Sequence, residues 1–138
     1  AHQVAAYIVF DMPLAVLCDS PTNYIRESET TYFINSIPAV FDSTFVHMSD
    51  LGNYLVMGRK KGDNYYLGAY NDWDARTIDV NLSFLPEGEY VAKIYKDGLN
   101  VDRVAEDYKL MERMVTSADV LNIDMGAGGG FAIIFSKK

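Results

Sequence analysis

The residues of this chain best suited to chemistry surround its single tryptophan, Trp73. Asn71, Asp72 and Asp74 flank the indole, so an aromatic face lies next to two carboxylates and an amide. An exposed aromatic ring can stack on a sugar while carboxylates accept hydrogen bonds from its hydroxyls. Large aromatic side chains are usually buried, however, and Asn and Asp are common turn residues. The segment therefore predicts either a carbohydrate-binding turn or a core or inter-domain tryptophan beside an ordinary loop.

The carbohydrate-binding hypothesis includes three tyrosines close to this turn in sequence. With Trp73, the rings of Tyr65, Tyr66 and Tyr70 would form a stacking platform if all four lay on an exposed sheet face. Burial of these rings would favour an architectural role. Exposure is therefore the property that separates the two readings.

Acidic and histidine residues do not form a recognisable metal or catalytic pattern. Asp97, Asn100 and Asp102 make a second acidic group, but neither group has the glycine at position six and the distal glutamate of a calcium loop. His2 and His47 are far apart and lack a companion ligand at metal spacing. No Gly-x-Ser-x-Gly elbow supports a Ser–His–Asp triad. We predict no metal site and no catalytic residue in this chain.

A glycine-rich run, Gly126 to Gly130, is the remaining motif with potential chemistry. A phosphate-binding loop lies between a strand and a helix and, in its commonest form, contains a lysine. Here an apolar, β-rich segment follows and the lysine is absent. The run therefore predicts a turn that leads into the last strand.

The elements that position these residues are mainly strands. Ile78, Val80, Leu82 and Phe84 alternate with polar residues, as in a strand with one buried face, and 64–71 is apolar on both faces. From residue 39 onward, short extended runs are separated by turns every 8–12 residues. We expect an antiparallel, Greek-key-like β-sandwich with strands near 40–48, 53–61, 64–71, 76–84, 89–96, 108–117, 119–125 and 130–136.

One or two helices are expected before the sandwich. Residues Val4 to Cys18 are apolar almost throughout, which predicts a buried helix that Pro13 either kinks or interrupts with the start of a new turn. The segment is too short for a membrane span. A second short helix is expected over 23–37, ended by Pro38. A small β domain has little room to bury the first helix, so we expect its partner to lie outside this chain.

Composition excludes several classes of function. The net charge of −7 and the pI of about 4.6 argue against nucleic acid as a partner. The largest basic cluster, Arg59-Lys60-Lys61, is interpreted as a strand end. The single cysteine, Cys18, cannot form an internal disulfide.

Colinear segments of this chain resemble the C-terminal part of glycoside hydrolase family 97. The segments similar to the end of its catalytic barrel are His2-Gln3, Tyr7-Ile8-Val9-Phe10, Pro13-Leu14 and Leu17-Cys18-Asp19-Ser20-Pro21-Thr22-Asn23-Tyr24. Those similar to its C-terminal β domain are Ile37-Pro38-Ala39-Val40-Phe41-Asp42, Asn71-Asp72-Trp73-Asp74-Ala75-Arg76, Leu82-Ser83-Phe84-Leu85 and Gly128-Gly129-Gly130-Phe131-Ala132. Asp72 departs from the Thr-Asn or similar small polar pair that the resemblance implies there. The resemblance implies a barrel-derived helical segment, 1–38, and a β-sandwich domain, 39–138.

The resemblance also carries expectations about function. The family comprises bacterial, calcium-dependent α-glucosidases and α-galactosidases of the periplasm, with an N-terminal sandwich, a (β/α)₈ barrel and a C-terminal β domain. Their catalytic carboxylates and calcium ligands lie in the first two regions, which match nothing here. The resemblance implies an inactive accessory domain that packs on the catalytic barrel of the same chain, aids oligomerisation and is periplasmic or secreted. Calcium would belong to the parent enzyme.

Overall fold

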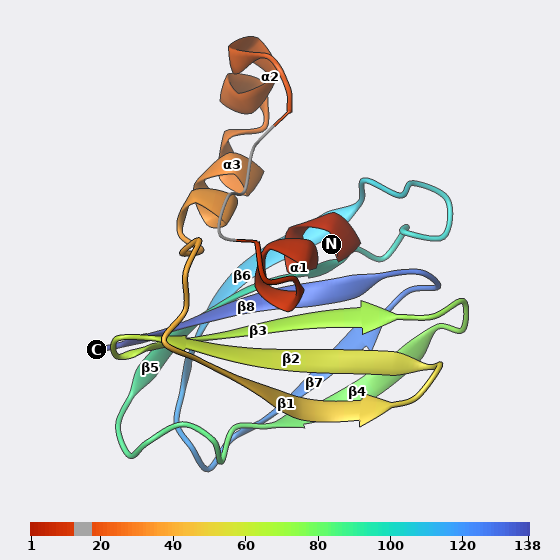
Figure 1. Cartoon of the computed structure of the whole chain (residues 1–138). Helices are drawn as coiled ribbons and strands as arrows, with labels where there is room; N and C mark the ends of the chain where they lie inside the picture. Colours follow the sequence, from red (N-terminus) through yellow and green to blue (C-terminus); the bar gives the residue numbers. More distant parts are fainter. Residues whose placement is uncertain (13–17) are drawn as a thin grey trace.

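The chain forms an antiparallel β-sandwich that carries helices on one face (Figure 1). The computed structural model describes residues 1–12 and 18–138. In these ranges the elements are α1 (His2–Val9), α2 (Pro21–Arg26), α3 (Ser28–Asn35), β1 (Ser43–Asp50), β2 (Tyr54–Lys61), β3 (Asn64–Asn71), β4 (Arg76–Asn81), β5 (Tyr90–Asp97), β6 (Tyr108–Val115), β7 (Val120–Met125) and β8 (Gly130–Lys137). The predicted fold class, mainly β with N-terminal helices, is confirmed.

Two sheets of unequal size form the sandwich. The larger has the strand order β1-β2-β3-β8-β5-β6, and the smaller pairs β4 with β7. All pairings are antiparallel, so β1, β3 and β5 end at the same end of the large sheet. The end of β7 lies there too, because the Gly126 N–H donates to Asp97 at the end of β5. The edges of the large sheet are β1 and β6, and the β1–β2 register shifts between Val46 and Met48.

The main hydrophobic core lies between the two sheets. In β4 the side chains of Ile78 and Val80 are buried and their neighbours face solvent, as the alternation predicts. The predicted extension of this strand to residue 84 is wrong, since β4 ends at Asn81. The Asn81 side chain accepts a hydrogen bond from the Ser83 N–H at 2.8 Å, and this turn ends the strand. Leu82 is still buried in the core.

The helices differ from the sequence prediction in their boundaries. A single helix over Val4–Cys18 is wrong, because α1 ends at Val9 and Phe10 is extended and exposed. The predicted kink at Pro13 lies outside the described residues. In place of one helix over 23–37 there are two, which Glu27 separates. Ser20 caps α2, and Pro21 occupies its first position, where a missing N–H costs nothing.

The helices occupy the outer face of the large sheet. The helix α1 lies across β3 and β8, whereas α2 and α3 rise away from the sandwich (Figure 1). We call the outer face of the large sheet, with α1 and α3 on it, the helix-bearing face, and α2 with α3 the arm. Among the described residues, no helix has the length and apolar character needed to cross a membrane.

Candidate functional site

The contact between α1 and the sheet is the most specific feature of the helix-bearing face. Val4, Ala5, Ile8 and Val9 are the buried side chains of this short helix. The expectation that its partner lies outside this chain is wrong, because α1 packs on β3 and β8. The helix lies so close to β3 that a Cβ atom on Gly68 would be 2.9 Å from the Ile8 Cβ. A glycine at this position therefore permits the backbone of β3 to approach the helix.

The C-terminal end of α1 is bound by an arginine from the sheet. Arg59 of β2 is only 6% exposed. Its guanidinium donates to the carbonyl oxygens of Ile8 at 2.8 Å and Val9 at 3.0 Å, and to the Thr44 hydroxyl at 2.8 Å. It also lies over the ring of Phe41. The last carbonyls of a helix have no partner within it, so Arg59 satisfies groups that burial would otherwise leave unpaired.

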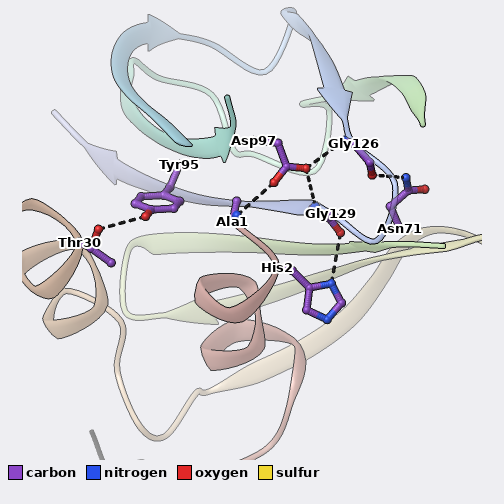
Figure 2. A network of polar contacts seen from close by, with 9 residues as sticks. Ala1, His2, Thr30, Asn71, Tyr95, Asp97, Gly126 and Gly129 are labelled. Carbon is purple, nitrogen blue, oxygen red and sulfur yellow. Dashed lines mark hydrogen bonds and ion pairs between the residues drawn. The ribbon is translucent and has the colours of Figure 1, made fainter. Parts of the chain in front are cut away.

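A buried carboxylate lies at the N-terminal end of α1. Asp97, at the end of β5, is also 6% exposed. It accepts hydrogen bonds from the N–H groups of Gly126 at 3.0 Å and Gly130 at 2.9 Å, and from the nitrogen of Ala1 at 3.0 Å (Figure 2). A Cβ on Gly129 would collide with this carboxylate. The backbone of the glycine run therefore wraps closely around the Asp97 carboxylate. The run forms a turn before β8, as predicted from the sequence.

Charges of opposite sign therefore hold the two ends of α1. A helix carries partial positive charge at its N-terminus and partial negative charge at its C-terminus. Asp97 and Arg59 match both, although neither belongs to the helix. We call this pair the α1 clamp. It fixes the position of α1 on the sheet by directional contacts in addition to apolar packing.

The first turn of α1 makes further contacts near the clamp. The ring of His2 stacks on Tyr70 of β3, with 4.0 Å between ring centroids. Its Nδ1 atom lies 3.3 Å from the carbonyl oxygen of Gly129 (Figure 2). Phe10 meets the same tyrosine ring edge-on. Tyr70 is therefore half-buried beneath the segment that enters the domain.

The arm is held on the sheet by a small group of aromatic and polar side chains. Phe33 of α3 is buried against Tyr95 of β5, and Tyr108 of β6 stacks on Tyr95 at 4.5 Å. Thr30 bonds to the Tyr95 hydroxyl at 3.0 Å, and the Tyr108 hydroxyl donates to Glu29 at 2.8 Å. Burial raises the pKa of Tyr95 to about 12. That ring thus reports on the contact between arm and sheet.

The four aromatic residues proposed from the sequence for carbohydrate binding do not share one surface. Trp73 is 87% exposed on the turn after β3. Tyr65 belongs to the core between the sheets, Tyr66 to the cluster beneath the helices, and Tyr70 lies under His2. The structure places only the tryptophan fully in solvent. A platform of all four rings is not formed.

The polar residues around Trp73 serve the turn itself. The Asn71 amide donates to the carbonyl oxygens of Asp74 and Gly126, both at 2.8 Å. Asp72 accepts from the Asp74 N–H at 3.0 Å and pairs with Arg76. These are contacts of turn residues. Within residues 1–12 and 18–138, no group of three His, Cys, Asp or Glu side chains is placed to hold a metal ion.

Sequence reasoning missed both members of the α1 clamp. Arg59 was interpreted as part of a basic strand end, and Asp97 as a turn residue. A signal existed for Asp97 alone, because clustered glycines indicate that something approaches their backbone closely. The partners of Arg59 lie 50 and 51 residues away in sequence and are backbone carbonyls, which leave no residue pattern.

Comparisons with known proteins agree with this architecture. Residues 40–136 match the family model described as "Glycosyl-hydrolase 97 C-terminal, oligomerisation". A retaining alpha-galactosidase of Bacteroides thetaiotaomicron is 44% identical over 132 residues, which are 96% of this chain and 20% of that protein. A probable retaining alpha-galactosidase of Streptomyces bingchenggensis is 25% identical over 97% of this chain and 20% of its own length.

Solved structures give the same result. A glycoside hydrolase family 97 enzyme from Pseudoalteromonas, in complex with acarbose, superposes with a TM-score of 0.94 at 32% identity, covering the whole chain and 22% of that enzyme. A beta-arabinopyranosidase shares the fold, with a TM-score of 0.76 at 20% identity over 96% of this chain and 20% of that one. The chain spans about one fifth of the length of these relatives. It belongs to the C-terminal oligomerisation domain family of glycoside hydrolase family 97.

Proposed function

We propose that this chain is a non-catalytic accessory domain that packs on the catalytic part of a longer α-glycosidase chain and supports its oligomerisation. The observation that carries the proposal is the α1 clamp. The helix α1 precedes the residues that match the family model, yet both of its ends are held by buried charges of the sandwich. Such a contact fixes the direction in which the preceding polypeptide joins the domain.

The parent reaction is proposed from the relatives. One relative is named a retaining alpha-galactosidase and another a probable one, so we propose hydrolysis of an α-galactosidic bond, with α-glucosides as the alternative substrate. Two carboxylates on the catalytic part would perform it. Calcium dependence and a periplasmic or secreted location are proposed from the family resemblance. The family resemblance implies that the catalytic part would bind this ion.

The test compares the 138-residue chain with the full-length protein. We expect the full-length protein to hydrolyse an aryl α-galactoside and to sediment as an oligomer, and the separate chain to have no hydrolase activity. In the full-length protein, Arg59→Leu should weaken association or thermal stability and leave the Michaelis constant within twofold. Hydrolysis by the separate chain would refute the non-catalytic assignment. A monomeric full-length protein would refute the role in oligomerisation.

A second candidate function rests on the exposure of Trp73. A tryptophan that is 87% exposed between two aspartates can stack on a sugar ring. Because Tyr65 and Tyr66 are buried, Trp73 would carry this binding alone or with the edge of Tyr70. Isothermal titration with galacto- and maltooligosaccharides tests it. Millimolar or tighter binding that Trp73→Ala abolishes would establish a carbohydrate-binding module, and no heat of binding would exclude one.

A further inference from the structure

A groove of about 770 Å³ separates the arm from the sandwich. Its walls are the first turn of α1, the inner side of α2 and α3, the ends of β5 and β6, and the turn over 127–129. Figure 2 shows its floor, where Ala1, Asp97 and Tyr95 lie close together and Thr30 reaches across from α3. The arm contacts the sheet at one side of this groove, where Phe33 packs on Tyr95 and the Thr30 hydroxyl bonds to the Tyr95 hydroxyl.

The groove contains the point at which the polypeptide enters the domain. Ala1 lies in its wall, and the α1 clamp directs the Ala1 nitrogen toward Asp97. The relatives are about five times longer than this chain. We propose that the segment immediately preceding Ala1 in the longer chain occupies this groove. This inference rests on the proposed function and specifies which surface the preceding polypeptide contacts first.

The charges of the groove indicate the chemistry of this segment. The carboxylates in its lining are those of Asp19, Glu27, Asp97 and Glu106, and the single guanidinium is that of Arg26. Arg26 is already 3.5 Å from Glu27. An excess of negative charge in a partly enclosed groove attracts a cationic side chain. The segment should therefore carry Lys or Arg within roughly ten residues before Ala1, a length that spans about 30 Å when extended.

Attachment at Ala1 supports this occupant. A segment tethered there has a high effective concentration, which favours it over a second copy or a free sugar.

The test blocks the groove in the full-length protein. Ala105 is exposed and lies in the lining, so Ala105→Trp fills the space. Ala118, exposed in the distant turn between β6 and β7, receives the same substitution as the control. Limited proteolysis just before Ala1 should become about tenfold faster in Ala105→Trp and stay unchanged in Ala118→Trp. Equal rates in both variants would overturn the inference.

Charge reversal gives an independent test. Glu106→Lys should speed the same cleavage several-fold, and exchanging the preceding basic residue for Glu in that background should restore protection. Absence of Lys and Arg from the ten residues before Ala1 would overturn the inference outright. Cross-links between the arm and the catalytic part, together with a proteolysis rate that the groove variants do not change, would refute only the groove assignment. Absence of any contact between domain and catalytic part would refute the proposed function itself.

Discussion

The sandwich interior and the helix-bearing face are stabilised in different ways. The interior consists of apolar side chains from both sheets, such as Leu67, Val80, Leu121 and Phe135. The helix-bearing face has a smaller apolar cluster and adds buried charges that contact backbone groups. Apolar burial stabilises without regard to direction, whereas hydrogen bonds to charged groups require one geometry. The interior therefore provides most of the stability, whereas the contacts on the helix-bearing face fix the position of α1.

The largest effect is expected from the interior. Phe135 is fully buried between the sheets, so Phe135→Ala should lower the free energy of unfolding by about 3–5 kcal/mol. Urea denaturation measures this change. Val120→Ala, on the half-exposed outer side of β7, is the control and should cost less than about 0.5 kcal/mol. A loss below about 1 kcal/mol at Phe135 would contradict the assignment of the interior as the main source of stability.

A smaller and local effect is expected at the C-terminal end of α1. Arg59→Leu leaves two helix carbonyls without a donor and should cost about 2–3 kcal/mol, as hydrogen bonds to charged groups do. Hydrogen exchange should show faster exchange in α1 and unchanged protection in β3 and β8. Arg113→Leu, on the exposed side of β6, is the matched control. Equal loss of protection in α1 and the strands would show that Arg59 stabilises the whole sandwich.

The other member of the clamp should give a milder effect. Asp97→Asn keeps the size of the side chain but removes its charge and turns an N–H₂ group toward backbone donors. The expected cost is about 1–2 kcal/mol, with faster exchange at Gly126 and Gly130. Asp102→Asn, exposed in the following loop, should change neither quantity. A stabilising Asp97→Asn would indicate that the buried charge is a net cost.

The smallest effect is spectroscopic and concerns the arm. Burial beneath α3 raises the pKa of Tyr95 from 10.0 to about 12. The unfolded chain loses this proton first, so the stability that the group contributes is complete below pH 10 and is lost as pH rises toward 12. Burial also raises the pKa of Tyr66, Tyr70 and Tyr90, so absorbance at 295 nm should show several late tyrosine transitions. The component that Tyr95→Phe removes belongs to Tyr95. Phe33→Ala should move it toward pH 10, and an unchanged transition would mean that the arm does not cover the ring.

The sequence predicts the strands of the sandwich better than the helix boundaries and the α1 clamp. Alternation in β4 identifies Ile78 and Val80 as core residues because a strand presents every second side chain to one side. The β3 segment was predicted to be covered on both faces, and Tyr65 and Tyr66 lie buried on opposite faces of the sheet. These predictions hold because they depend on neighbours in sequence.

The helix boundaries and the clamp depend on distant contacts instead. An apolar run over Val4–Cys18 carries no sign that the helix stops at Val9, where Arg59 binds its last carbonyls. Trp73 shows the same limit of sequence-based prediction, here as an exposed residue that was expected to be buried. Its size argued for burial, but the adjacent Asp72 and Asp74 bond within the turn and leave the indole in solvent.

The shift in register at the edge of the large sheet bears on how copies of the protein associate. The extra residue in β1, His47, interrupts the row of N–H and C=O groups that an edge strand offers to another strand. The opposite edge, β6, carries Lys109, Glu112 and Arg113. Charges and bulges both discourage edge-to-edge pairing. Assembly of this family member should therefore proceed through side-chain surfaces, and its concentration can rise without seeding a continuous sheet.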